Sequence, residues 1–230
     1  MKRMDMKVKL LRYTSEPERT VALAAKLCYS PLELADLDAK LDQETIQNFV
    51  LKLIDLGHFS ALEHASFTFA AEGVSRALTH QLVRHRIASY SQQSQRYVSG
   101  HNFAPIMPLS VQANAHAAQR FTQLMNNIKN TYDELIALGI DKEDARYVLP
   151  NAAGSKLIIT MNARSLFNFF ELRCCQRAQW EIRRLAEIML AEAKKTAPVL
   201  FSKAGPSCVT RGICREGELS CGRLRREKAQ

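Results

Sequence analysis

Three parts of the chain have the pattern of a β-strand. In two of them hydrophobic and polar positions alternate, and the third is a short apolar run. Residues 6–13 alternate as a strand would. Residues 155–161 form an apolar run typical of a buried strand. Residues 64–71 alternate as well, and this spacing places His64 and Ser66 together on the polar face of a third predicted strand.

Elsewhere the apolar positions recur at helical spacing, and polar residues mark where helices begin and end. The segment 15–18 resembles a capping box, and Asn162 precedes a helical stretch as an N-cap residue would. The polar segment 87–95 has no periodicity and predicts a loop. Helices are predicted from Ser15 toward Cys28, from Ile46 to Gly57, over 74–85, from about 111 to Gly139, briefly after Asp141 with Glu143 and Arg146, from Asn162 to about 174, and over 178–196 up to Pro198.

Strands are few and are separated by long helices, without the regular alternation of a doubly wound sheet. This order predicts the α+β class. A chain of 230 residues is long enough for one domain with a sizeable core. We expect a single domain over residues 1–202, followed by a basic, cysteine-containing tail over residues 203–230.

Composition fits a globular protein, with 47% hydrophobic and 24% charged residues. No run of about 18 apolar residues occurs, so no membrane span is expected. The first ten residues are basic and lack the apolar core of a signal peptide, which predicts a cytoplasmic location.

The formal net charge of +9 favours anionic partners, which leaves nucleic acids and small phosphorylated ligands both open. Part of the excess lies in the tail, where a solvated segment is expected; these residues are Arg211, Arg215, Arg223, Arg225, Arg226 and Lys228.

Six cysteines in a cytoplasmic chain predict free thiols. Cys28, Cys174 and Cys175 are expected to be buried in helices. The tail cysteines include no Cys-x-x-Cys pair, so we predict no metal site and keep zinc as an alternative for Cys208, Cys214 and Cys221.

The densest set of anion donors lies in residues 84–97, RHRIASYSQQSQRY. Arginine offers a planar fork that matches phosphate oxygens in pairs, and serine hydroxyls can fill further acceptor sites. From composition alone, a solvated basic loop is an equally good interpretation.

The spacing Arg-His-Arg, seven intervening residues, then Ser resembles the signature of the flavin-dependent thymidylate synthases, and Arg84 to Ser94 matches it without a gap. Three further stretches are similar to that family: Glu63-His64 with Gln81, Glu143-x-x-Arg146-x-x-Leu149-Pro150, and residues 162–173 followed by 178–182. The resemblance extends from about residue 6 to residue 196.

The resemblance implies an α+β fold with a central, mostly antiparallel sheet flanked by long helices. It implies methylation of dUMP to dTMP with 5,10-methylenetetrahydrofolate as the one-carbon donor, FAD as hydride carrier and NADPH as reductant. It also implies a homotetramer with flavin bound where subunits meet, and no nucleic-acid partner.

Carried over residue by residue, the resemblance assigns two sets of ligand contacts. The dUMP set is Gln81, Arg84, Gln93, Ser94, Arg96, Arg146 and Arg173. The FAD set is His64, Ser66, Arg84, His85, Arg86, Gln92, Asn162, Arg164 and Asn168. Five residues separate Asn168 from Arg173, or about 140° around a helix, so the two would face different ligands.

Arg173 is the predicted catalytic residue. Its guanidinium is too weak a base to take a proton, but it can stabilise the uracil anion formed when N3 is deprotonated. None of the cysteines lies in these motifs, apart from Cys174 directly after Arg173, so activation of the substrate by a thiolate is not indicated. Ser94 as a nucleophile is an alternative, although no neighbouring acid or lysine would activate it.

One departure from the family pattern concerns the flavin loop, where Ser91-Gln92 replaces the usual Asn-Glu. Glutamine keeps hydrogen-bonding capacity and lacks the carboxylate charge. Two other functions stay open on the sequence: a basic nucleic-acid-binding protein, and a flavoprotein oxidase that has lost methyl transfer.

Overall fold

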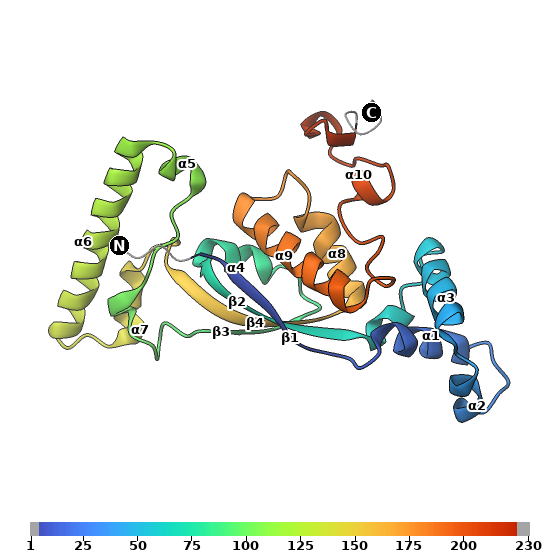
Figure 1. Ribbon diagram of the computed structural model, residues 1–230. Coiled ribbons are helices and arrows are strands. Elements are labelled where there is room, and N and C mark those ends of the chain that lie inside the picture. Colours follow the sequence, from blue (N-terminus) through green and yellow to red (C-terminus); the bar gives the residue numbers. More distant parts are fainter. Residues whose placement is uncertain (1–4, 225–230) are drawn as a thin grey trace. The chain divides into compact units, whose positions relative to one another are not determined.

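The computed structural model describes residues 5–224 and contains one four-stranded antiparallel sheet, in the order β1-β2-β4-β3. The strands are β1 (Lys7–Tyr13), β2 (Ser66–Ser75), β3 (Ser89–Gln92) and β4 (Gly154–Asn162). Helices separate the strands along the chain, as Figure 1 shows, which confirms the α+β class.

Most of the helices agree with the periodicity of the sequence. The α-helices are α1 (Pro17–Leu27), α2 (Leu34–Ala39), α3 (Gln43–Asp55), α4 (Arg76–Leu82), α5 (Leu109–Gln112), α6 (Ala115–Ala137), α7 (Lys142–Ala145), α8 (Ala163–Arg173), α9 (Trp180–Thr196) and α10 (Ser207–Thr210). The 3₁₀ helices are η1 (Ala61–His64), η2 (Gly100–Asn102), η3 (Arg146–Val148) and η4 (Gly217–Leu219).

The chain divides into two compact units. Among the described residues, the first holds Ala71–Arg84, Tyr90–Ile158 and residues 5–7. The second holds Val8–Ala70, His85–Ser89 and residues 159–224. The expected single domain over residues 1–202, with a tail from 203, stays a prediction.

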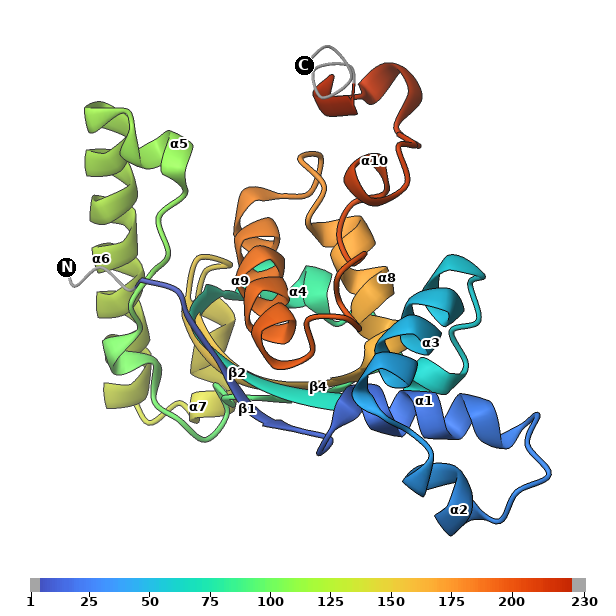
Figure 2. The same cartoon turned by 45° about the vertical axis from the view of Figure 1, so that its right-hand side comes forward.

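In the second unit, α1, α2 and α3 form one helical group, visible in blue in Figures 1 and 2. The predicted capping box at the start of α1 is wrong. Glu16 occupies the N-cap position with a φ of 43°, and its side chain makes no cap hydrogen bond. The Glu18 carboxylate instead accepts hydrogen bonds from the backbone N–H groups of Val199 (2.7 Å) and Leu200 (3.0 Å).

Aromatic rings pack together in the second unit, where α8 and α9 are neighbouring helices (Figure 2). Phe201 meets the ring of Phe67 edge-on at 5.1 Å and stacks on Phe167 at 5.8 Å between centroids. Such pairs contribute about 0.5–1.5 kcal/mol each beyond the burial of their area. The apolar face of the alternating strand therefore points into this core, where Phe67 and Phe69 are fully buried.

The start of α9 gives a structural reason for the residues 178–182, which belong to one of the stretches similar to the family. The Gln179 side-chain oxygen accepts hydrogen bonds from the backbone N–H groups of Glu181 (3.0 Å) and Ile182 (3.1 Å). Gln179 therefore caps the helix, since it satisfies two of the four N–H groups that a helix leaves without an internal partner.

In the first unit, the long helix α6 packs beside α5 and fixes the segment after residue 97 (Figure 1). The hydroxyl of buried Tyr132 accepts a hydrogen bond from the Gly100 N–H at 2.9 Å. A Cβ on Gly100 would stand 3.0 Å from Leu149 Cδ1. The space around Gly73 in β2 is smaller still, because a Cβ there would lie 2.5 Å from the Asp5 carbonyl oxygen. Its φ of +70° also favours glycine.

Several element boundaries differ from the prediction. The helix expected over 74–85 begins only at Arg76, because Val74 continues β2 and the Ser75 hydroxyl caps α4 by accepting from Leu78 N–H at 3.0 Å. The expected loop over 87–95 contains β3. Asn114 caps α6 and separates it from α5, so the long helix starts later than residue 111.

The tail is tied to α8. Arg211 Nη2 lies 2.8 Å from Glu171 Oε2, and Arg215 Nη1 lies 3.8 Å from Glu171 Oε1. Both arginines remain exposed, so the expectation of a solvated tail stays a prediction, with these ion pairs added to it. Arg225, Arg226 and Lys228 lie outside the described residues. Between residues 5 and 224, no helix has the length and apolar character needed to cross a membrane.

Candidate active site

The end of α8 brings two predicted site residues together in the second unit. Arg173 is the last residue of the helix, and its Nε donates a hydrogen bond to Nε2 of His85 at 2.9 Å. The His85 ring also meets Phe169 edge-on, with centroids 4.9 Å apart and ring planes at 86°. Phe169 and Arg173 are four residues apart, so they share one face of α8.

The protonation state of His85 follows from this environment. Burial, followed by the adjacent positive charge of Arg173, lowers the pKa of His85 from 6.5 to about 4. The ring is therefore neutral at pH 7, and its unprotonated Nε2 can accept the Arg173 hydrogen. Burial also lowers the pKa of Arg173 from its ordinary value.

The N-terminus of α8 gathers a second group of predicted residues. Asn162 caps the helix as predicted, and its side-chain oxygen accepts from the Ser165 N–H at 2.9 Å. The Ala163 N–H donates to the Ala65 carbonyl oxygen at 2.7 Å. This backbone bond brings Asn162 beside the segment that carries His64 and Ser66.

Two more residues of the FAD set lie on α8 itself. Arg164 Nη1 lies 2.5 Å from Oε1 of Glu63, the residue before His64. Arg164 and Asn168 are both exposed and stand four residues apart, so they point from the same face of the helix. Asn168 and Arg173 are five residues apart on the same helix. Their side chains therefore leave it in directions that differ by about 140°, as predicted.

The prediction that His64 and Ser66 share one face of a strand is wrong. His64 ends the 3₁₀ helix η1, and β2 begins only at Ser66. Alternation of polar and apolar residues in the sequence continues through Ala65 and hides this change. Both side chains are exposed.

In the first unit, Gln92 takes part in a buried polar group. Its Nε2 donates to Ser155 Oγ at 3.0 Å and to Thr79 Oγ1 at 3.3 Å. Ser155 and Thr79 are 5% and 1% exposed. A glutamine amide can donate these bonds and an ionised glutamate could not, so the departure from the family pattern fits its surroundings.

Gln93 and Ser94 line a pocket of about 340 Å³ in the first unit. The Gln93 N–H donates to the Lys156 carbonyl oxygen at 3.0 Å, which fixes the backbone of this segment on β4. The Ser94 hydroxyl accepts from the Arg96 N–H at 3.1 Å. The remaining lining includes Glu72, Gly100, Phe103 and Lys156.

Glu143 links two arginines of the dUMP set. Arg96 Nε forms an ion pair with the Glu143 carboxylate, and Arg146 Nε donates to the Glu143 carbonyl oxygen at 3.0 Å. Burial, and then the charge of Arg146, lowers the pKa of Arg76. Arg76 is thus a further cation near Arg146 that the motifs did not indicate.

Three further predicted residues are Gln81, Arg84 and Arg86. Gln81 Nε2 donates to the Ala77 carbonyl oxygen of its own helix at 3.4 Å, while Arg84 and Arg86 are exposed. The Tyr90 hydroxyl donates a hydrogen bond to the carbonyl oxygen of Leu82, the last residue of α4, at 2.9 Å. It thereby satisfies one of the carbonyl groups at the C-terminus of the helix, two residues before Arg84.

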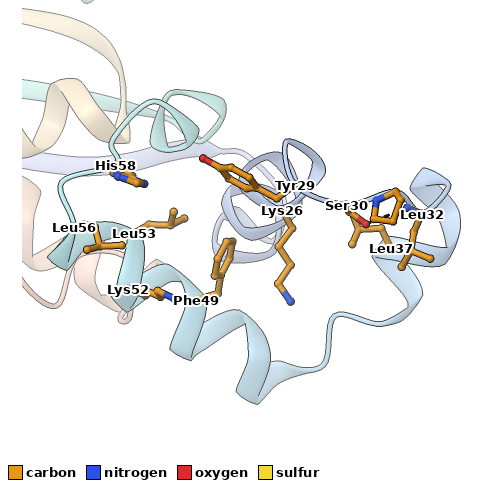
Figure 3. A pocket seen from close by; sticks show the side chains of 11 residues that line it. Lys26, Tyr29, Ser30, Leu32, Leu37, Phe49, Lys52, Leu53, Leu56 and His58 are labelled. Carbon is orange, nitrogen blue, oxygen red and sulfur yellow. Dashed lines mark hydrogen bonds between the residues drawn. The ribbon is translucent and has the colours of Figure 1, made fainter.

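Between α1 and α3 lies a larger pocket of about 550 Å³ that the sequence patterns did not indicate (Figure 3). Phe49 and Leu53 contribute apolar wall, and Tyr29 is 81% exposed at the rim. Lys26 places its ammonium 5.4 Å from the centroid of the Phe49 ring. Lys52 and His58 complete a basic border, so a flat apolar molecule with an anionic end would fit its chemistry.

All six cysteines are free thiols, as predicted. Cys174 is buried, whereas Cys28 is exposed and Cys175 is partly exposed, so the prediction of burial is wrong for the last two. Burial, chiefly, raises the pKa of Cys174 to about 12. Within residues 5–224, no group of histidine, cysteine or acidic side chains is arranged to hold a metal ion.

The fold and these side chains define an α+β protein with arginine and amide groups suited to phosphate-bearing ligands. The profile of the family described as thymidylate synthase complementing protein matches residues 9–199. The chain belongs to this family.

The relatives have similar lengths. A flavin-dependent thymidylate synthase of Clostridium tetani is 52% identical, with 96% of this chain and 95% of the relative covered. That of Geobacter sulfurreducens is 54% identical, covering 95% and 94%. That of Thermococcus onnurineus is 41% identical, covering 98% and 97%.

Proposed function

We propose that this protein converts dUMP to dTMP by reductive methylation, with 5,10-methylenetetrahydrofolate as one-carbon donor, FAD as hydride carrier and NADPH as reductant. The observation that carries the proposal is the pair formed by Arg173 and neutral His85, on a chain that matches flavin-dependent thymidylate synthases over nearly its whole length. The same motifs that produce the resemblance supply this pair.

Arg173 supplies the activation of the pyrimidine. Its guanidinium stabilises the ring anion after loss of the N3 proton, which raises electron density at C5 for attack on the one-carbon unit. A thiolate would be the other means of activation, and the neighbouring thiol argues against it: Cys174 is buried and its pKa is raised to about 12, so it stays protonated.

Residues of the first unit bind the nucleotide phosphate in this proposal. The Ser94 hydroxyl and the Gln93 amide line a polar pocket, and Arg96 and Arg146 both contact Glu143. A phosphate dianion would compete with the Glu143 carboxylate for Arg96. The full set proposed for dUMP is Gln81, Arg84, Gln93, Ser94, Arg96, Arg146 and Arg173.

The start of α8 suits the flavin cofactor. A helix N-terminus with a neighbouring arginine attracts a pyrophosphate, and Arg164 and Asn168 point from the same face of this helix. FAD supplies hydride, which no side chain can provide. The residues proposed to hold it are His64, Ser66, Arg84, His85, Arg86, Gln92, Asn162, Arg164 and Asn168.

The pocket between α1 and α3 has the chemistry that a folate donor needs. Phe49 and Leu53 can hold an apolar ring system, and Lys26 and Lys52 can pair with carboxylates. NADPH as reductant, a homotetramer with flavin at subunit contacts and a cytoplasmic location are part of the same proposal. A chain of this size without the glycine-rich dinucleotide motif supports binding between subunits.

Spectroscopy of the purified protein tests the proposal. We expect a flavin absorption spectrum that is bleached by NADPH and restored when dUMP and methylenetetrahydrofolate are added together. A colourless protein that binds DNA in a salt-sensitive manner would refute it.

A further inference from the structure

Arg173 has a long side chain with many rotamers, so its position at the end of α8 needs a partner. The partner is His85, whose Nε2 accepts the Nε hydrogen of Arg173 at 2.9 Å. This bond uses Nε. It therefore does not use the two terminal nitrogens that form the planar fork for anionic groups.

His85 is itself held in place. Its ring is 9% exposed and meets Phe169 edge-on, and Phe169 belongs to the same helix as Arg173. The imidazole therefore links the segment 84–86 to the catalytic end of α8, with a fixed orientation of the accepting nitrogen.

We propose that His85 is a positioning residue for Arg173, which orients the guanidinium fork toward the pyrimidine of the substrate. This role deepens the proposed function and rests on it. It is distinct from the flavin contact that the resemblance implies for the same histidine.

The neutral charge of the acceptor matters for this role. A carboxylate at the same place would form an ion pair with Arg173 and offset much of the positive charge that stabilises the uracil anion. A neutral imidazole fixes the side chain and leaves its charge for the substrate. The low pKa of His85 keeps the ring in this state at neutral pH.

Two substitutions separate this role from a purely structural one. In His85→Gln the amide oxygen can accept in place of Nε2, whereas in His85→Leu no acceptor remains. Both variants are compared as flavin-loaded enzyme with wild type and with His116→Leu, which removes an exposed histidine of α6. The measurements are kcat and KM for dUMP, flavin content and NADPH-driven flavin reduction.

We expect His85→Leu to lower kcat about 10- to 100-fold at saturating dUMP, because small misplacement of a catalytic group has costs of this order. KM for dUMP should change less than about threefold. Because His85 is also a proposed flavin contact, flavin reduction is compared on fully loaded enzyme and should fall less than kcat does, and His85→Gln should recover at least half of the loss in kcat on a logarithmic scale. His116→Leu should match wild type.

Loss of flavin from both His85 variants to the same degree would overturn the proposal, since it would assign the histidine to the cofactor alone. Unchanged kcat in His85→Leu would overturn it as well. If His85→Leu does not fold, His85→Gln decides: near-normal kcat supports positioning through an acceptor, and a loss as large as that of Arg173→Ala contradicts it.

A second readout does not depend on turnover. In ¹⁵N-arginine-labelled protein, the Arg173 Nε–H should exchange with solvent more slowly in wild type and His85→Gln than in His85→Leu. Equal exchange rates in all three proteins would show that His85 does not hold the Arg173 Nε–H in a hydrogen bond. Absence of thymidylate from the wild type would instead refute the proposed function, and the exchange result would still test the contact.

Discussion

Arg173 and Ser94 have different roles in this account, and substitution separates them. Arg173→Ala should abolish thymidylate formation even at saturating dUMP while NADPH still reduces the flavin, because the guanidinium interacts most strongly with the anionic ring. Arg173→Lys should recover little, since an ammonium is a point charge without the planar fork. Ser94→Ala should mainly raise KM for dUMP.

Steady-state and single-turnover kinetics of these three variants check the assignment. Near-normal turnover in Arg173→Ala, together with bound nucleotide but no turnover in Ser94→Ala, would reverse the roles and restore serine as the nucleophile.

The protonation of His85 gives a pH-dependent stability. Its folded pKa of about 4 lies below its ordinary 6.5, so the unfolded chain binds more protons between these values. The contribution is complete above pH 6.5 and is lost as the pH falls toward 4. It amounts to at most about 3 kcal/mol, and to less where solvent reaches the ring.

Urea unfolding of wild type and His85→Gln at pH 7 and pH 5 measures this contribution. The wild type should lose more unfolding free energy between the two pH values than the variant does. An identical loss would show that His85 is not held neutral by its surroundings.

At the level of residues, the sequence motifs named the members of each cluster but not their contacts. Nothing in the spacing of His85 and Arg173 shows that they meet, because 88 positions separate them and the fold alone joins them. Gln92 was identified as a departure, and its buried partners Thr79 and Ser155 became visible only in three dimensions.

Among the elements, α8 carries members of both proposed ligand sets, Arg164 and Asn168 for FAD and Arg173 for dUMP, and its cap can be tested. Asn162→Ala removes the acceptor for the Ser165 N–H and should lower stability by about 1 kcal/mol. It should also weaken flavin binding, because Asn162 is itself one of the proposed cofactor contacts.

Asn114→Ala is the matched control, since Asn114 caps α6 by accepting from the Ala117 N–H at 3.0 Å. It should lower stability to a similar extent without changing flavin affinity. Equal flavin loss in the two variants, by denaturant unfolding and flavin titration, would mean that the start of α8 has no particular part in cofactor binding.

Long periodic segments were the best predicted elements. The strands β1 and β4 and the helices α3, α8 and α9 agree with their hydrophobic spacing, since that spacing reports which face is buried. The strand β3 was missed because its four residues are polar and gain their hydrogen bonds from the sheet. The capping box at Glu18 failed because backbone N–H groups near residue 200 use the carboxylate.

At the scale of the whole molecule, the sequence predicts the α+β class and the family. The observed elements confirm the first, and the family match over residues 9–199 confirms the second. Oligomeric state has no comparable signal in hydrophobic spacing, because an apolar position can face a core or a second subunit alike.

We predict a homotetramer with flavin at subunit contacts. Sedimentation velocity with detection at a flavin wavelength should show the flavin only in a species of about four chains. Dilution that separates the subunits should release the flavin. A monomer that holds flavin tightly would contradict the prediction.

The most direct test of the central claim follows the one-carbon unit itself. Purified enzyme is incubated with dUMP, NADPH and methylenetetrahydrofolate labelled with ¹³C at its methylene carbon, and the nucleotide is analysed by mass spectrometry. We expect dTMP with the label in its C5 methyl group, formed by wild type and absent with Arg173→Ala. NADPH oxidation by the wild type without labelled dTMP would contradict it and would identify the protein as a flavin oxidase.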